Sequence, residues 1–243
     1  MTSNRVDAYR HARGRVLERI GAACARVGRD PAGVTLLAVS KTVPAEALRD
    51  AVAAGLDLLG ENRVQEGLAK APAVPGARWQ LVGPLQANKV RKALAVFESV
   101  QTVDSVALAE RLDRLAGETR PEVRYPVLLQ VNVDDDPAKA GFLPADLEAA
   151  IDRLEELPHL DLRGLMTIGR LVDDPEAARP TFRRLRALSE RLRARGAPIG
   201  PALSMGMTDD FEVAVEEGAT IVRVGRALFG ERHDTSEAGH PHG

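Results

Sequence analysis

Short apolar runs rich in β-branched residues alternate with longer amphipathic segments along almost the whole chain. Eight of these runs predict β-strands, at 35–40, 57–61, 78–83, 99–103, 126–133, 160–168, 202–206 and 220–225. Helical patterns fill most of the intervals, at 45–54, 63–71, 88–97, 106–117, 144–157, 175–195 and 209–217, and a leading helix is expected over 6–27. The alternation predicts a protein of the α/β class.

Strands that alternate with helices form parallel sheets with right-handed crossovers, and eight is the number of strands that closes a TIM-like (β/α)8 barrel. An open doubly wound sheet is the alternative, but no glycine-rich dinucleotide fingerprint follows the first strand. We therefore expect one barrel domain over residues 1–230. Residues 231–243 are expected to be a disordered polar tail, whose three histidines we interpret as solvated rather than metal-binding.

Composition excludes several classes of protein. The 33 basic and 35 acidic side chains give a formal net charge of -2, so we expect no general attraction to nucleic acid. Cys24 is the only cysteine, which excludes an internal disulfide and suits a reducing compartment. The first residues lack the apolar core of a signal peptide, and no apolar run approaches the ~20 residues that span a bilayer. We expect a soluble, cytoplasmic protein with no membrane partner.

Lys41 follows the first apolar strand directly, in the sequence Ala-Val-Ser-Lys-Thr at 38–42. Lysine is strongly hydrated, so its burial is costly unless the amine is paired or neutral. A partly desolvated amine at the end of a strand is suited to form a Schiff base with an aldehyde. The structural alternative is a lysine that simply extends into water.

Other polar groups follow the predicted strands, at the end of a barrel where active sites lie. They include Glu61 and Asn62; Gln86, Asn88 and Lys89; Asn132 and Lys139; the segment Ser204–Thr208; and Arg223 with Arg226. Each of them alone is compatible with ordinary loop chemistry. Because the carboxyl ends of parallel strands meet at one rim, a single shared site is the better interpretation.

The segment after the seventh strand has the features of a phosphate-binding loop. Gly206 permits close approach of the backbone, Ser204 and Thr208 supply hydroxyls, and a helix is expected to begin near Asp209. The alternative is an ordinary helix cap at Thr208 or Asp209. The acids at 209, 210 and 212 favour that alternative unless they point away from the loop.

Arg223 interrupts the apolar run at 221–225, and a charge within a strand needs a partner or a ligand. One interpretation is a buried ion pair with Glu61 or Asp104. The other is a donor directed at an acceptor atom of a ring in the barrel mouth.

A lysine on the first strand, a phosphate loop after the seventh and an arginine on the eighth together describe a pyridoxal phosphate site. The chain resembles the pyridoxal phosphate homeostasis protein family from about residue 5 to residue 230. The resemblance rests on six motifs in order: Ala-Val-Ser-Lys-Thr at 38–42, Gly-Glu-Asn at 60–62 with Gln65 and Glu66, Val-Gly-Pro-Leu-Gln-Ala-Asn-Lys at 82–89, Gly-Leu-Met at 164–166, Leu-Ser-Met-Gly-Met at 203–207, and Val-Arg-Val-Gly at 222–225 with Phe229 and Gly230.

This resemblance implies a fold-type III barrel like the N-terminal domain of alanine racemase, with pyridoxal 5′-phosphate as cofactor. It implies that Lys41 carries the Schiff base, that Arg223 faces the pyridine nitrogen and that Asn62 lies near the cofactor. The implied phosphate site consists of Ser204, Gly206, Thr208, Gly225 and Arg226. By the same resemblance Lys139 tunes cofactor exchange. Gln80 and Pro84 stand where histidines are frequent in the family, and Val43 stands where some members have a second lysine.

We expect a cofactor-binding protein of intracellular pyridoxal phosphate homeostasis, without turnover of its own. Guanidinium opposite the ring nitrogen favours an unprotonated pyridine, which is a weaker electron sink than one paired with a carboxylate. The alternative is an amino-acid racemase of the alanine racemase type, which needs an acid/base group on each face of the substrate carbon. The only tyrosines available for that role are Tyr9 and Tyr125, and the chain ends shortly after the eighth strand. A third possibility is a phosphosugar enzyme that uses Lys41 without bound cofactor. We expect a monomer whose partners are the cofactor and pyridoxal-phosphate-dependent apo-enzymes.

Overall fold

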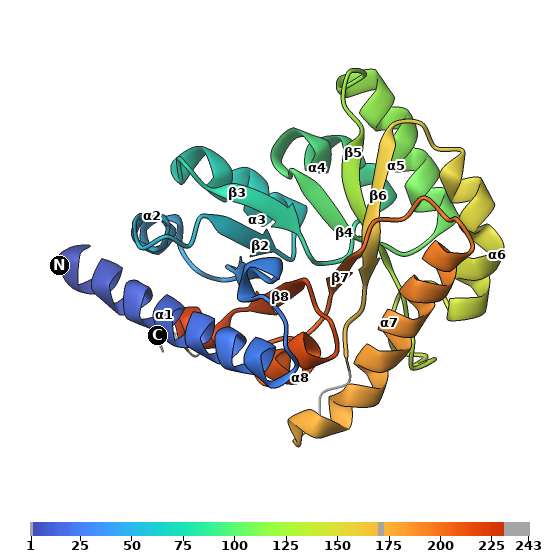
Figure 1. Ribbon diagram of the computed structural model, residues 1–243. Coiled ribbons are helices and arrows are strands. Elements are labelled where there is room, and N and C mark those ends of the chain that lie inside the picture. Colours follow the sequence, from blue (N-terminus) through green and yellow to red (C-terminus); the bar gives the residue numbers. More distant parts are fainter. Residues whose placement is uncertain (1, 170–172, 231–243) are drawn as a thin grey trace, which may run out of the picture.

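The protein is a closed barrel of parallel strands surrounded by helices (Figure 1). The computed structural model describes residues 2–169 and 173–230. Within them, eight strands pair in chain order from β1 to β8, and β8 pairs with β1 to close the barrel. The predicted (β/α)8 fold is confirmed. The predicted tail at 231–243 lies outside the described residues.

The strands and helices follow the predicted alternation closely. The strands are β1 (Thr35–Val39), β2 (Leu58–Glu61), β3 (Arg78–Leu81), β4 (Ser99–Val103), β5 (Tyr125–Gln130), β6 (Leu160–Met166), β7 (Ala202–Ser204) and β8 (Ile221–Val224). The helices are α1 (Thr2–Arg26), α2 (Ala45–Ala53), α3 (Val64–Lys70), α4 (Val90–Val96), α5 (Val106–Thr119), α6 (Pro144–Glu155), α7 (Arg179–Ala194), α8 (Phe211–Glu216) and α9 (Arg226–Phe229). None of the described helices is long and apolar enough to cross a membrane.

The two faces of the strands form separate environments. Ala38 and Val224 are neighbours on β1 and β8, and both belong to the large apolar core. The preceding pair in the register, Leu37 and Arg223, lies outside that core although both residues are buried. Because successive side chains in a strand point to opposite faces, Leu37 and Arg223 face the barrel interior. The interior therefore receives a charged group, while the apolar core lies between the strands and the helices.

Helix α1, at the start of the described chain, packs against the helices at its end. It packs against α2, α8 and α9, and runs along the same side of the barrel as α8 in Figure 1. Arg19 donates to Glu212 of α8 at 3.0 Å, and its guanidinium carbon lies 4.5 Å from the centre of the Phe211 ring. At the other end of α1 the rings of Tyr9 and Phe229 meet edge-on with centroids 5.6 Å apart. These contacts hold the first and last units together.

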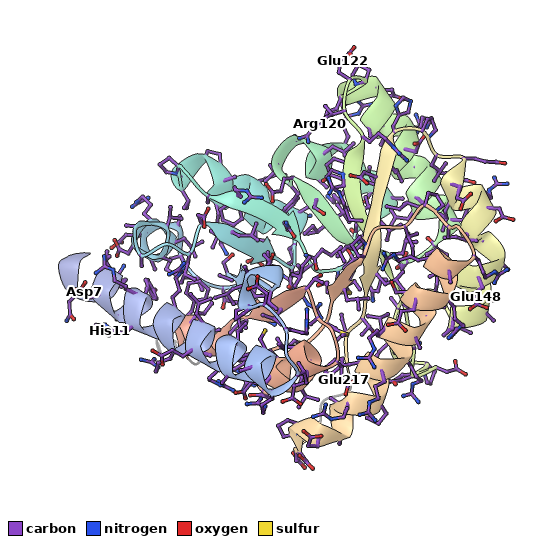
Figure 2. The ribbon with its side chains drawn as sticks, viewed as in Figure 1. Asp7, His11, Arg120, Glu122, Glu148 and Glu217 are labelled. Atoms are coloured by element: carbon purple, nitrogen blue, oxygen red, sulfur yellow. The ribbon has the colours of Figure 1, made fainter. Side chains whose placement is uncertain are left out.

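A buried carboxylate fixes α7 against the end of α8. Glu217, labelled in Figure 2, accepts from Arg179 Nη1 at 2.8 Å and from Arg183 Nε at 3.0 Å. Its side chain is only 5 % exposed. Three arginines of α7 surround it, since Arg186 Nη1 also lies 3.3 Å from its Oε2. A carboxylate with several charge-assisted partners is tolerated in such a buried position.

Tyr125 opens β5 at the end of the barrel remote from the predicted site. Its hydroxyl donates to the carbonyl of Phe97 at 2.9 Å, and Arg120, labelled in Figure 2, lies over its ring. Burial raises the pKa of this phenol. Replacing Tyr125 with phenylalanine leaves the Phe97 carbonyl without that donor, so we expect a loss of about 1–2 kcal/mol in the free energy of unfolding, measured in urea. Tyr9→Phe is the control, because the Tyr9 hydroxyl donates to no described residue; an equal loss in both variants would contradict the assignment.

Candidate functional site

Lys41 lies at the carboxyl end of β1, two residues beyond the last residue of the strand. Its side chain is partly buried, and its amine makes no hydrogen bond or ion pair with any described residue. Residues 41 and 42 lie in a turn that follows β1 at the carboxyl end of the barrel, and the Val43 amide closes this turn on the Ser40 carbonyl at 3.0 Å. The amine of Lys41, which has no partner among the described residues, therefore lies at the carboxyl rim of the barrel, and its predicted role as the Schiff-base lysine stays a prediction.

The residue before Lys41 belongs to a buried polar group that the sequence analysis did not identify. Ser40 is fully buried, and its hydroxyl lies 2.8 Å from Oε1 of Glu61. The same oxygen of Glu61 accepts from Lys70 Nζ at 2.7 Å. Burial raises the pKa of the Glu61 carboxyl, while the ammonium of Lys70 opposes that shift. Glu61 therefore forms a buried salt bridge with Lys70.

Asn62 follows β2 and remains partly buried at the same rim. Its backbone lies against Gly83, where an added Cβ would come within 2.2 Å of the Asn62 carbonyl oxygen. The loop after β3 can approach the loop after β2 only because residue 83 is glycine. The Asn62 side chain forms no hydrogen bond with a described residue and is available to a ligand.

Arg223 is 5 % exposed and points into the barrel. Its Nη1 donates to Oγ of Ser204 at 2.7 Å, and its Nη2 donates to the carbonyl of Thr167 at 2.8 Å. Burial lowers the pKa of Arg223 to about 10, so the guanidinium stays protonated at neutral pH. The ion pair with Glu61 or Asp104 that the sequence allowed is absent from the described residues. Glu61 is held by Lys70, and the hydroxyl of Ser105 contacts Asp104 instead.

A chain of hydrogen bonds continues from Arg223 across the barrel interior. Ser204 Oγ donates to Gln101 Oε1 at 2.6 Å, and Gln101 Nε2 donates to Gln80 Oε1 at 2.7 Å. Gln80 in turn donates to Glu98 at 3.1 Å. Gln101 was not among the residues predicted from the sequence. A polar glutamine inside the β-strand run Ser-Val-Gln-Thr-Val could have indicated a side chain that faces the barrel interior. This series of hydrogen bonds fixes the orientation of the Arg223 guanidinium through Ser204.

The segment after β7 turns sharply toward α8. Gly206 has a φ of +89°, and an added Cβ would lie 2.5 Å from Cβ of Ala214. Its carbonyl accepts from the amide of Arg223 at 3.0 Å, which ties the segment to β8. Thr208 is partly buried, and its hydroxyl bonds to no described residue. The helix begins at Phe211 rather than near Asp209, because residues 208–210 form a turn.

The acids that weakened the phosphate interpretation all have partners. Asp209 pairs with Arg226, Asp210 accepts from the amide of Met207 at 2.6 Å, and Glu212 pairs with Arg19. Arg226 begins the short helix α9, directly after Gly225. Its charge is therefore shared with Asp209 in this structure, and a bound phosphate would compete with that carboxylate.

Asp210 gives this loop a dependence on pH. Burial raises the pKa of its carboxyl, and the Met207 amide and Arg223 only partly oppose the shift. A carboxyl with a raised pKa in the fold stabilises it when protonated and loses that contribution as the pH rises through the folded pKa. Lowering the pH from 7 to about 4 should therefore raise the unfolding free energy of the protein relative to Asp210→Asn. Urea unfolding of both proteins at a series of pH values checks this, and a constant difference would contradict it.

The loop after β5 comes from the opposite side of the barrel, since β5 is four strands away from β1. Asn132 donates to the carbonyl of Asp136 at 2.9 Å and so organises the loop internally. The Nζ atom of Lys139 is buried without a hydrogen bond, 3.7 Å from a carboxylate oxygen of Asp136. The structure does not bring Lys139 into contact with Lys41, and its predicted role in exchange stays a prediction.

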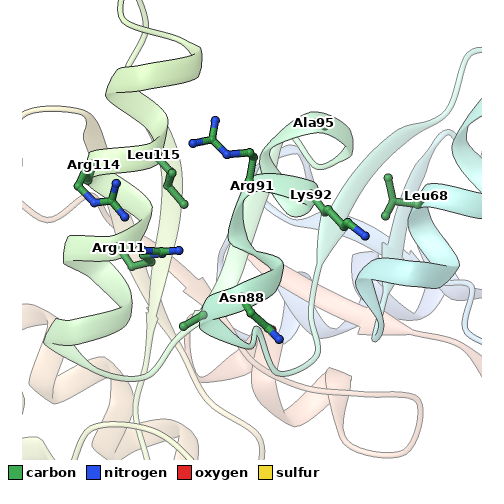
Figure 3. Close-up of a pocket in the computed structure, with 9 residues that line it drawn as sticks. Leu68, Asn88, Arg91, Lys92, Ala95, Arg111, Arg114 and Leu115 are labelled. Atoms are coloured by element: carbon green, nitrogen blue, oxygen red, sulfur yellow. The ribbon is translucent and has the colours of Figure 1, made fainter.

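One of the predicted residues after β3, Asn88, lies away from the other candidate site residues. Asn88 lines a groove of about 470 Å³ that opens between α4 and α5 (Figure 3). The groove is basic, with Arg91, Lys92, Arg111 and Arg114 around it, and contains none of the predicted cofactor residues. Arg91 and Arg114 both pair with Glu118. The barrel mouth and this groove are separate features.

Three of the predicted site residues supply groups that are chemically suited to the predicted ligand, a small phosphorylated aldehyde. Lys41 offers a free amine, Arg223 a fixed cationic donor, and the segment around Gly206 a compact backbone turn. These three groups lie on β1, on β8 and after β7, which are consecutive strands in the barrel. No group of three or more His, Cys, Asp or Glu side chains within residues 2–169 and 173–230 is arranged to hold a metal ion.

Known proteins resemble this chain over most of its length. The family model described as "Alanine racemase, N-terminal domain" matches residues 16–233. A protein named "Pyridoxal phosphate homeostasis protein" from Aquifex aeolicus is 43% identical over 220 residues, which are 90% of this chain and 96% of the relative. One of the same name from Pseudomonas aeruginosa is 45% identical over 223 residues, or 90% of this chain and 93% of the relative.

Solved structures agree with these sequence matches. PipY of Synechococcus elongatus, in a structure described as having PLP bound, has a TM-score of 0.76 and 42% identity, and the match covers 88% of this chain and 100% of PipY. An alanine racemase from Clostridium difficile has a TM-score of 0.71 with 17% identity. That match covers 95% of this chain but only 58% of the racemase, and at this identity it shows a shared fold alone.

Proposed function

Because this chain belongs to the alanine racemase N-terminal domain family, and within it to the pyridoxal phosphate homeostasis proteins, we propose that it binds pyridoxal 5′-phosphate in intracellular homeostasis of that cofactor. The cofactor is held as a Schiff base on Lys41. The protein holds and releases the cofactor without turning over a substrate of its own. The PLP-bound relative PipY supports the choice of ligand.

The observation that carries the proposal is the free amine of Lys41 at the barrel mouth. Lys70, Arg223 and Arg226 already have polar partners at this rim. Lys139 has a buried Nζ without a hydrogen bond, but it lies in the loop after β5, on the opposite side of the barrel. The cofactor supplies an aldehyde, which condenses with this amine with loss of one water molecule. The residues of the chain have only to bind, orient and retain it.

The remaining predicted residues have roles in orientation. Arg223 donates toward the ring nitrogen, and its charge is kept in place by Ser204. The phosphate is bound by the turn at Gly206 and Thr208 and by the start of α9 at Gly225 and Arg226. The hydroxyl of Ser204 donates its single proton to Gln101 and accepts from Arg223, so we assign it to the support of Arg223; its predicted contact with the phosphate stays a prediction.

The absence of turnover is part of the proposal and has two supports. A guanidinium without acceptor capacity does not protonate the pyridine nitrogen, which weakens the ring as an electron sink. Racemisation also needs a second acid/base group at the substrate carbon. Tyr125 is buried at the far end of β5 with its hydroxyl bound to Phe97, and Tyr9 packs on Phe229 outside the barrel.

Borohydride reduction followed by peptide mass spectrometry tests the binding. We expect a pyridoxyl mass on the peptide that contains Lys41; a modification confined to other lysines would contradict the proposal. Incubation of free amino acids with the protein in deuterated water tests the racemase alternative, because a racemase exchanges the Cα proton. A phosphosugar enzyme would bind no pyridoxal phosphate and show no visible absorption.

We also propose that the protein acts in the cytoplasm, as a monomer that passes the cofactor to apo-enzymes. Cys24 is buried and unpaired, which suits a reducing compartment. Size-exclusion chromatography with light scattering tests the oligomeric state. Reactivation of a pyridoxal-phosphate-dependent apo-enzyme by the loaded protein tests the transfer.

A further inference from the structure

A buried charge pair lies beside Lys41 and has no part in the function proposed above. Glu61 and Lys70 are joined by a 2.7 Å hydrogen bond, and their side chains are 0% and 12% exposed. Only one oxygen of Glu61 is bonded, and Oε2 is buried without any hydrogen-bond partner. Such a pair is expensive to desolvate, and well-packed apolar side chains often stabilise a fold equally well. Its presence here calls for a reason other than stability.

The pair contacts the chain immediately before Lys41. Lys70 Nζ donates to the carbonyl of Ser40 at 3.0 Å, and the Ser40 hydroxyl lies 2.8 Å from Oε1 of Glu61. The amide of Ser40 is bonded to the carbonyl of Gly60 at 2.9 Å. Every polar group of Ser40 is therefore fixed by β2 or by the end of α3.

The chain immediately after Lys41 is held by the same ammonium through a third residue. Lys70 Nζ lies 3.3 Å from Oε2 of Glu66, and this oxygen is also 3.4 Å from the amide of Thr42. Lys70 thus uses its three donors on Ser40, Glu61 and Glu66. The ammonium connects the two peptide units that flank the reactive residue.

The backbone after Lys41 needs such support. Thr42 has a φ of +66°, in the left-handed region that β-branched residues avoid. The amide of Val43 closes the turn by donating to the carbonyl of Ser40 at 3.0 Å. A strained turn persists only where its surroundings determine it. The Thr42 hydroxyl donates to the Lys41 carbonyl at 2.5 Å, and Lys70 and Glu66 bond to the two flanking peptide units from outside the turn.

We propose that Glu61 and Lys70 are positioning residues that hold the turn at Lys41 and thereby slow the release of the cofactor from its amine. The inference rests on the proposed function for the release step. It acts through the chain, because Lys70 bonds to Ser40 and Glu66 rather than to Lys41. Groups that orient a ligand-bearing residue from behind commonly change affinity or rate by about 10–100-fold.

The test compares Lys70→Met, Glu61→Gln and the double variant with the parent protein. Hydrogen exchange of the Val43 amide, in protein free of cofactor, measures the turn itself. Release is measured on the loaded protein by adding a phosphatase that consumes free pyridoxal 5′-phosphate and following the visible absorption. Arg153→Met is the matched control. It removes a surface ion pair between Arg153 on α6 and Glu110 on α5, away from the turn.

In both single variants we expect the Val43 amide hydrogen to exchange, and the cofactor to be released, about 10-fold faster than in the parent protein. The double variant should be no faster than either single one, since the pair acts as a unit. Lys70→Arg should restore part of the slow release, and Arg153→Met should match the parent. Gln at position 61 keeps the shape of the side chain, so Glu61→Gln decides the matter if Lys70→Met does not fold.

Each folded variant, Glu61→Gln or Lys70→Met, must change both the exchange of the Val43 amide and the release of the cofactor. If either rate equals that of the parent protein, the proposal is overturned. Failure of the proposed function has a different signature, since borohydride would then add no pyridoxyl mass to Lys41 of the parent protein. In that event the exchange of Val43 still decides whether the pair holds the turn.

Discussion

Lys41→Ala is expected to abolish both the visible absorption of the loaded protein and the pyridoxyl mass added by borohydride. The covalent bond needs this amine, because Lys70, Arg223 and Arg226 are engaged with partners and Lys139 lies in the loop after β5, on the opposite side of the barrel. The phosphate turn and Arg223 remain in the variant, so weak binding should persist. We expect the affinity to fall at least about 100-fold, which corresponds to about 2.8 kcal/mol. Equilibrium dialysis against pyridoxal 5′-phosphate measures the loss.

The control for this variant is Lys92→Ala, which removes an exposed lysine in the groove between α4 and α5. It should leave the absorption, the mass and the affinity unchanged. Retention of the full absorption by Lys41→Ala would refute the assignment of the Schiff base. Loss of absorption in both variants would point to a general effect of removing a lysine.

The second large effect is expected from Gly206→Ala. At a φ of +89° an alanine is strained, and its Cβ would lie 2.5 Å from Ala214 Cβ and 2.9 Å from Phe211 Cα. Either α8 moves or the turn opens, and both change the predicted phosphate site. We expect a loss of about 3 kcal/mol in the free energy of unfolding together with weaker binding of the cofactor. Urea unfolding and dialysis measure the two effects.

Gly21→Ala provides a control of opposite sign. Gly21 lies inside α1, and an added Cβ there meets no atom within 4 Å. Alanine favours the helix over glycine, so this variant should gain about 0.5–1 kcal/mol without any change in binding. An equal loss in Gly21→Ala and Gly206→Ala would show that the clash at α8 is not the cause.

The fold was predictable because its signal is local and repeated. Each strand is a short run of apolar, often β-branched residues between helical patterns, and the predicted boundaries differ from the observed ones by only a few residues. The differences have tertiary causes. The run at 202–206 ends as a strand at Ser204, because the turn at Gly206 directs the chain toward α8. The run at 126–133 ends as a strand at Gln130, and Val131 then makes only an isolated bridge to Phe142.

Two residues that the structure places at the carboxyl end of the barrel were predictable as site candidates, because each is chemically out of place in its own segment. Lys41 ends an apolar strand and Arg223 interrupts one, so both stand out in the sequence alone. Lys70 did not, because a lysine at the end of an amphipathic helix is ordinary. Its hydrogen bonds are to Glu61 of β2 and to Ser40 just after β1, which lie 9 and 30 residues away in the chain. Because these contacts of Lys70 are not visible in the sequence, Arg223 was considered as the partner of Glu61.

Closure of the barrel has a consequence for the newly made protein. Lys41 follows β1 and Arg223 lies on β8, so the two halves of the proposed cofactor site become neighbours only through the pairing of the first strand with the last. During synthesis the reactive lysine leaves the ribosome long before the arginine that is to face it. If the proposed site binds the cofactor, stable capture is expected only after translation of the eighth strand, because the sheet of a nascent chain stalled before that point is still open.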